Sequence, residues 1–217
     1  MKFRNLIPKT DEGSFAVLAL PIVVGAFLLA FLSVFQLLIP HYWIAYATNE
    51  DLKRHIALGL NFRDALLQGQ IIPRLQPNPL SIPDIPVFQY YGFLSSLFTQ
   101  PGLMFGLSPF HALISGVVII RWLAEIGIYI TCRILNLTRS ASAIAVIAWI
   151  SFPYIQSNFY GRIAIPETFA QAILVMLPLS WAIASYRSKR IAAIVVAVTV
   201  LLLALAHPIF LMWGVGA

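Results

Sequence analysis

A run of 25 residues without a charged side chain, residues 15–39, limits what this chain can fold into more than any other feature of the sequence. A helix needs roughly 20 apolar residues to cross the hydrocarbon core of a bilayer, so the run predicts a transmembrane helix. The composition agrees, because 60% of the residues are hydrophobic and only 10% are charged, and the mean hydropathy is +0.86. These values are typical of integral membrane proteins and exclude a soluble domain.

Further apolar runs predict further spans. The expected spans are residues 15–39, 108–134, 141–154 with an extension as far as 159, 166–186 and 191–213. We therefore expect an all-α fold, a polytopic bundle of about five transmembrane helices that forms a single domain over residues 1–217. An odd number of helices with no polar tail after the last one predicts a truncated chain or a part of a larger bundle.

The one long polar segment, residues 48–86, lies between the first two runs. Apolar residues recur at helical spacing over residues 51–68, so we expect an amphipathic helix there, lying at the membrane surface and ended by Gly69. The apolar positions are Leu52, Ile56, Leu60 and Leu67. Repeated prolines over residues 73–86 then exclude regular structure. Residues 87–98 are apolar but too few for a span, which favours a re-entrant or interfacial helix.

The charges of the loops predict an orientation. Lysine and arginine dominate the amino-terminal segment and the expected loops around residues 135–140 and 187–190, whereas acids balance them in the other two loops. Cytoplasmic loops are enriched in Lys and Arg, so we expect a cytoplasmic amino terminus and a first extracytoplasmic loop over residues 48–100. The net charge of +6 is explained by these short clusters, so nucleic acid is not an expected partner. Cys132 is the only cysteine, which excludes a disulfide framework or a thiolate metal site.

Asp51 is the first candidate for chemistry. A carboxylate just outside a membrane helix, beside Glu50 and one helical turn from His55, has the properties of a general base or of a ligand to a divalent cation. The other interpretation is local, since Thr48 and Asp51 have the spacing of a capping box and acids are favoured in the first turn of a helix. The two interpretations are compatible.

Four more residues are candidates for binding a substrate. Arg74 and Arg162 carry guanidinium groups suited to a phosphate, although an arginine that binds a lipid headgroup looks the same in sequence. Glu167 follows a proline at an expected helix start, where both residue types are common for local reasons. His207 lies in an apolar run, where a histidine bonded to a backbone carbonyl is the simpler explanation. The orientation argument places all these residues, with Glu50, Asp51 and His55, on the outer side.

Two charged residues lie inside an expected span. Arg121 and Glu125 are one helical turn apart in the run 108–134. Charged groups at membrane depth are unfavourable by about 2.5 to 3.5 kcal/mol each on insertion scales, so we expect both to face the bundle and to pair with each other. A structural pair and a buried relay both fit this pattern.

Several short motifs, taken in order, resemble a bacterial family of multi-span proteins catalogued as 6-pyruvoyl-tetrahydropterin synthase-related membrane proteins. That family is similar to the GT-C type glycosyltransferases. The motifs are Asp51 to His55, Ala65-Leu-Leu-x-Gly69, Pro73-Arg74, Phe88-x-Tyr90-Tyr91, Tyr160-Gly-Arg162, Pro166-Glu167-x-x-Ala170 and His207-Pro208. The histidine-rich zinc site of the soluble pterin synthase has no counterpart in this sequence.

The GT-C resemblance implies an enzyme of the bacterial cytoplasmic membrane that transfers a sugar from a polyprenyl-phosphate donor at the outer face. By this analogy Asp51 activates the acceptor hydroxyl or helps to bind a divalent cation, and Arg74 or Arg162 neutralises the departing lipid phosphate. The relatives are longer, with more spans and often a further outer domain. The alternative is a non-catalytic multi-span protein, a transporter or an assembly component, whose partner is membrane lipid.

Overall fold

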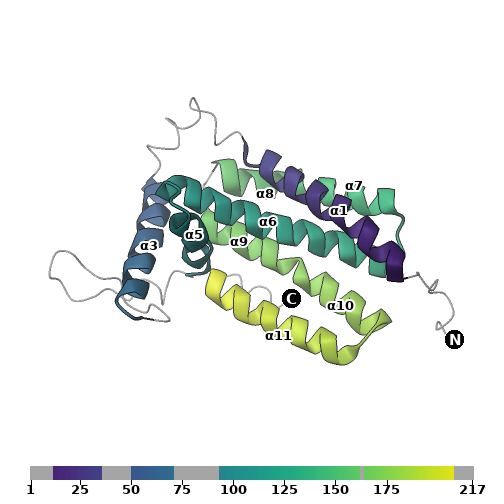
Figure 1. The fold of residues 1–217 in the computed structure, drawn as a ribbon. Coiled ribbons are helices and arrows are strands. Elements are labelled where there is room, and N and C mark those ends of the chain that lie inside the picture. Colours follow the sequence, from purple (N-terminus) through teal and green to yellow (C-terminus); the bar gives the residue numbers. More distant parts are fainter. Residues whose placement is uncertain (1–11, 36–49, 71–92, 162–163, 208–217) are drawn as a thin grey trace.

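The computed structural model describes residues 12–35, 50–70, 93–161 and 164–207 (Figure 1), and their side chains within 22–35, 51–70, 93–160 and 164–207. Every regular element in these residues is a helix, as the sequence predicts. The elements are α1 (Glu12–Leu32), α3 (Glu50–Leu67), α5 (Leu94–Met104), α6 (Pro109–Ile134), α7 (Arg139–Ile150), α8 (Pro153–Gln156), the π-helix η3 (Ser157–Gly161), α9 (Ile165–Leu174), α10 (Met176–Tyr186) and α11 (Lys189–Ala206).

Most of these helices lie lengthwise beside one another, and α3 lies across one end of the bundle (Figure 1). The central helix is α6, which contacts α1, α3, α5, α7, α9 and α10. It begins after Ser108, whose side chain accepts a hydrogen bond from the backbone N–H of His111, and Pro109 occupies the first turn. A capping serine followed by proline starts a helix for local reasons, so the predicted start at residue 108 is confirmed.

Three helical stretches are long and apolar enough to cross a membrane, namely Pro109–Ile134, Ile165–Tyr186 and Lys189–Ala206. A fourth is added if the bent pair Arg139–Ile150 and Pro153–Tyr160 counts as one span. Within α1 the apolar part with described side chains, Ile22–Leu32, is shorter than a span. Residues 36–39 and 208–213, which we included in the first and last expected spans, lie outside the described part. The structure thus confirms an apolar helical bundle, and the number five stays a prediction.

Prolines explain two interruptions. The third expected span bends by 46° between α7 and the following helix, because Pro153 lacks an N–H and holds the residue before it in an extended conformation. Phe152 indeed has φ −62° and ψ 124°. Between α9 and α10, Pro178 has no N–H to donate to the carbonyl of Leu174, the residue where α9 ends.

The helix α3 confirms the predicted amphipathic helix, but its buried face is rotated from the one expected: Leu52 is buried and Ile56 packs against the core, as expected, while Leu67 is not buried. It ends at Leu67, just before Gly69, whose φ of +87° favours glycine. The expected apolar position Leu67 is 79% exposed, whereas His55 is buried. The buried side chains are Leu52, His55, Leu58, Phe62 and Ala65. The spacing of apolar residues along α3 fits two adjacent faces of the helix. The face that contains His55 is the buried one, because α5 packs against α3.

We predicted a short helix over residues 87–98. The observed helix α5 begins at Leu94, directly after its N-cap Phe93, and residues 87–92 lie outside the described part. It packs closely on α6, since a Cβ on Gly102 would lie 2.7 Å from the Cα of Ala112. A Cβ on Gly116 would lie 2.9 Å from the carbonyl oxygen of Phe98. These two glycines allow the close contact between the helices.

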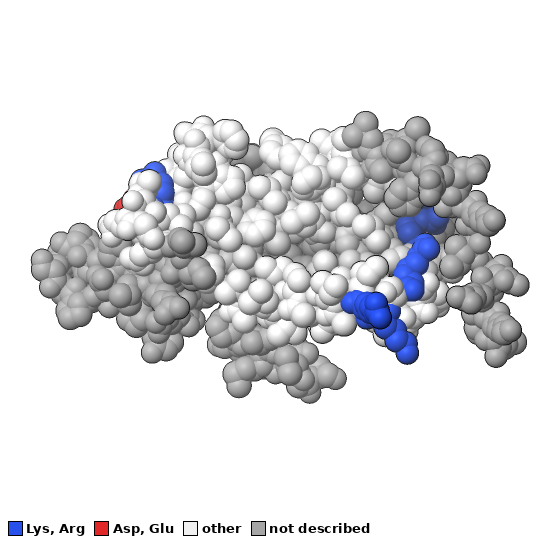
Figure 2. All heavy atoms as spheres, turned by 60° about the horizontal axis from the view of Figure 1, so that its bottom comes forward, with Lys and Arg blue, Asp and Glu red and all other residues white. Residues whose placement is uncertain are grey.

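The two ends of the bundle differ in charge. The turns from α6 to α7 and from α10 to α11 lie at the end opposite α3 (Figure 1). Exposed basic residues gather at those turns, and Figure 2 shows Lys and Arg at that end with an uncharged surface along the middle of the face drawn. The residues are Arg133, Arg139, Arg187, Lys189 and Arg190.

Candidate functional site

The start of α3 carries the first pair of predicted site residues. Asp51 is exposed and His55 is buried, and the charge of Asp51 acts on the imidazole one helical turn away. Burial lowers the pKa of His55 to about 4, against the opposing effect of Asp51, and Arg54 lowers it further. His55 is therefore neutral at neutral pH. The side chain of Glu50 and the predicted cap Thr48 lie outside the described part.

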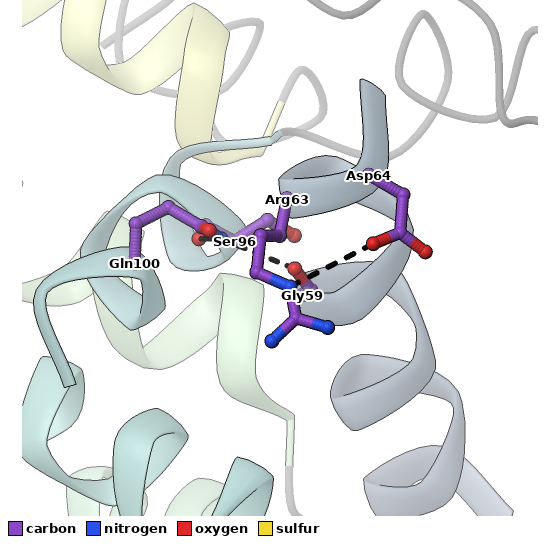
Figure 3. Close-up of polar contacts among 5 residues, drawn as sticks. All are labelled: Gly59, Arg63, Asp64, Ser96 and Gln100. Carbon is purple, nitrogen blue, oxygen red and sulfur yellow. Dashed lines mark hydrogen bonds and ion pairs between the residues drawn. The ribbon is translucent and has the colours of Figure 1, made fainter. Parts of the chain in front are cut away.

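Polar contacts hold α3 on α5 (Figure 3). The Nε2 of Gln100 donates hydrogen bonds to the carbonyl oxygens of Gly59, at 3.1 Å, and Ser96, at 2.7 Å. One turn further along α3, the Nε of Arg63 lies 3.6 Å from a carboxylate oxygen of Asp64. The first contact is buried and positions the helix, while both partners of the second are half exposed.

A second pair comes from two separate helices. Glu167 lies in the first turn of α9, behind Pro166, and His207 directly follows α11. Burial lowers the pKa of His207, and the carboxylate of Glu167 opposes this effect, so the two side chains lie within electrostatic range. His207 has an extended backbone, with φ −160° and ψ 101°, as expected for a residue before a proline.

The two pairs lie at the same end of the bundle, away from the basic turns. The start of α9 and the end of α11 lie near α5, which in turn contacts α3 (Figure 1). Because α5 packs against α3, α9 and α11, it connects the two pairs. The arginines Arg74 and Arg162 lie outside the described residues, as does the proline-rich segment 73–86. Within the described part, no group of three His, Cys, Asp or Glu side chains is placed to hold a metal ion.

The predicted ion pair between Arg121 and Glu125 is wrong in its geometry. Both residues are buried, as expected, but no hydrogen bond joins them. The Nη1 of Arg121 instead donates to the Oγ of Ser33, at 2.9 Å, and its Cζ lies 4.4 Å from the centre of the Phe159 ring. A cation over an aromatic ring and a hydroxyl acceptor compete with the carboxylate for the guanidinium.

Sequence reasoning missed the partners of Arg121. The hydroxyl of Tyr160 donates to the carbonyl oxygen of Ser33, so this one residue, next to the end of α1, meets both α6 and η3. Asn158 and Gln171 are further buried polar residues. A signal was available for Gln171, a polar residue inside an apolar stretch, whereas Asn158 follows the polar residues Gln156 and Ser157, which indicate a turn.

No protein-family model, curated protein or solved structure matches this chain.

Proposed function

We propose that this chain is a GT-C-like membrane glycosyltransferase, or the amino-terminal part of one, acting at the outer face of a bacterial cytoplasmic membrane. Its donor is a sugar on a polyprenyl phosphate. The observation that carries the proposal is the gathering of Asp51, Glu167 and His207 at one end of an apolar bundle, opposite the basic turns. A donor held in the bilayer and an acceptor in water meet at such an end, and the basic turns favour the opposite end as cytoplasmic.

In the proposed reaction Asp51 is the general base. Its exposed carboxylate accepts the proton of the acceptor hydroxyl while the acceptor oxygen bonds to the anomeric carbon of the sugar. The bond from that carbon to the phosphate oxygen breaks, and its electron pair leaves with the polyprenyl phosphate. Arg74 or Arg162 neutralises the charge of this leaving group. Glu50 and a divalent cation are further candidates for binding the donor phosphate.

The remaining residues have positioning and binding roles. His55 is buried and neutral, so we propose that it positions the first turn of α3 rather than exchanging a proton with the acceptor. Glu167 and His207 present an acceptor and a ring nitrogen within range of each other, a set that suits sugar hydroxyls.

The test uses the full chain in lipid nanodiscs with radiolabelled polyprenyl-phosphate sugars, and follows release of the sugar to a soluble acceptor or to water. Asp51→Asn is expected to lower the rate by roughly 100-fold or more, as for loss of a general base, while the protein still inserts. Asp64→Asn removes another exposed acid of the same helix and is expected to keep the rate. Failure of every donor to bind, or equal rates in the two variants, would exclude the proposal.

One observation favours a second candidate, a transporter. The bend between α7 and α8 and the π-helix η3 interrupt a stretch of apolar helix, and interrupted helices often form the binding sites of transporters. A transporter would move a labelled solute into sealed proteoliposomes in a way that Asp51→Asn leaves unchanged. A transferase would instead modify the donor in open nanodiscs.

A further inference from the structure

The bundle interior holds two charged side chains with unused hydrogen-bonding atoms. Arg121 is 2% exposed and Glu125 is 0% exposed, and both lie on the candidate span α6. Neither carboxylate oxygen of Glu125 has a hydrogen-bond partner in the described structure, and neither have the Nε and Nη2 of Arg121. Of the guanidinium nitrogens, Nη1 is the one that donates a hydrogen bond, and its acceptor is Ser33.

This arrangement suits a charged arginine and a neutral carboxyl. Two contacts stabilise the charge of Arg121, the hydroxyl of Ser33 and the face of the Phe159 ring. Glu125 has no such contact, and an ionised carboxylate without a hydrogen bond in an apolar interior is far less favourable than a protonated one.

We infer that Glu125 is a proton-binding site inside the bundle and that Arg121 changes partner when the proton leaves. In the arrangement described here the carboxyl carries the proton. On release the O–H bond breaks, its electron pair stays on the carboxylate, and the proton passes to solvent. The ionised carboxylate then attracts the free edge of Arg121.

The geometry of α6 permits this exchange. Residues four apart lie on the same side of a helix, so Glu125 and Arg121 are neighbours. The Nε and Nη2 of arginine lie on one edge of the planar guanidinium and bind a carboxylate through two parallel hydrogen bonds. Both atoms are unused, so they are available to the carboxylate when the two side chains turn toward each other.

The exchange would reach beyond α6. Ser33 lies one residue beyond α1, and its carbonyl oxygen also accepts the hydroxyl of Tyr160 from η3. Releasing Arg121 from Ser33 therefore loosens the junction of α1, α6 and η3. In sequence α1 leads to Asp51 and η3 leads to Glu167, so proton binding would influence the end of the bundle that carries the candidate site. The inference does not depend on the transferase proposal.

Few other ionisable groups surround the pair. Tyr160 and Glu125 are the ionisable groups whose charges act on Arg121, and Arg121 is the one that acts on Glu125. In the described side chains of the packed elements, α5 and α1 contribute no ionisable residue, and those of α7, α9 and α10 lie at helix ends. They are Arg139, Glu167 and Tyr186, with the residues of α3 at the bundle end. On α6 itself the other ionisable residues are His111, Tyr129, Cys132 and Arg133.

Infrared difference spectroscopy of the full chain in nanodiscs tests the proton. The carbonyl stretch of a protonated carboxyl should be present at neutral pH, absent in Glu125→Gln and retained in Asp64→Asn. A spectrum that Glu125→Gln leaves unchanged would overturn the inference. If that variant does not fold, a second variant keeps Glu125 and replaces Glu12, Glu50 and Glu167 by glutamine. Labelling its glutamate with ¹³C then isolates the band of Glu125, and absence of this band would also overturn the inference.

Titration of this band tests the exchange of partners. Ser33→Ala removes the competing hydroxyl, so the ionised form gains Arg121 more easily and the proton dissociation constant of Glu125 should rise several-fold. Arg121→Gln removes the cation and should lower that constant by at least tenfold. Ser115→Ala is the matched control, because the Ser115 hydroxyl donates to the carbonyl of Ala112 and not to this pair. Equal constants in Ser33→Ala and Ser115→Ala would exclude the exchange.

Discussion

The side-chain amide of Gln100 on α5 donates a hydrogen bond of 3.1 Å to the backbone carbonyl of Gly59 on α3. This bond is buried and joins residues 41 positions apart. Gly59 allows the approach, because a Cβ there would lie 3.3 Å from the Cγ2 of Thr99. One contact thus links the helix that carries Asp51 to the helix that contacts α9 and α11.

Replacing Gln100 should loosen α3. Gln100→Leu removes the bonds to Gly59 and Ser96, of which the first joins the two helices, so we expect a loss of about 0.5 to 1.5 kcal/mol in the docking of this helix. Faster hydrogen exchange of the α3 amides in detergent micelles would measure it. Gln68→Leu, at the exposed end of α3, is the control, and equal exchange in both variants would contradict the assigned role.

The α5 and α6 pair should not tolerate side chains at its glycines. In Gly116→Ala the new Cβ meets the Phe98 carbonyl at 2.9 Å, and in Gly102→Ala it meets the Ala112 backbone at 2.7 Å. Each change should lower stability by about 1 to 3 kcal/mol, as for other overpacked sites. Gly25→Ala is the control, since nothing lies within 4 Å of its Cβ position. Thermal unfolding in one detergent would compare the three.

Local signals explain what could be predicted from the sequence. The proline after Ser108 and the glycine at position 69 each act within a few residues, and α6 begins and α3 ends where they indicate. The face that α3 buries depends instead on α5, a helix that begins 27 positions after α3 ends (94 − 67). Side-chain periodicity carries no information about that partner.

The error at Arg121 has the same origin. Spacing of four residues correctly indicates that Arg121 and Glu125 are neighbours, but Ser33 lies 88 positions away. Phe159 competes from a third segment. The candidate site shows the other limit, because the sequence could assign Glu167 and His207 to one side but could not show that α9 and α11 bring them into electrostatic range.

Removing the charge of Glu167 should lower the pKa of His207. Burial already lowers this pKa and the carboxylate opposes it, so Glu167→Gln leaves burial alone to act. NMR titration of labelled histidine, assigned with His207→Gln, would measure the change. Asp51→Asn should shift the same titration less, because Glu167 is the charged residue that acts on His207 in the described structure. A larger shift in Asp51→Asn would place Asp51 nearer to His207 than Glu167 is.

Protonation of His55 should weaken the docking of α3 in acid. Burial lowers the pKa of this residue from 6.5 to about 4, so between these values the undocked helix binds a proton that the docked helix does not. The docking energy is therefore constant above pH 6.5, falls as the pH is lowered towards 4, and is reduced by up to about 3 kcal/mol in total. Hydrogen exchange of the α3 amides across this range would follow the loss. In His55→Gln the acid dependence should disappear, while His111→Gln, an exposed position on α6, should keep it; the same dependence in both variants would assign the effect to another group.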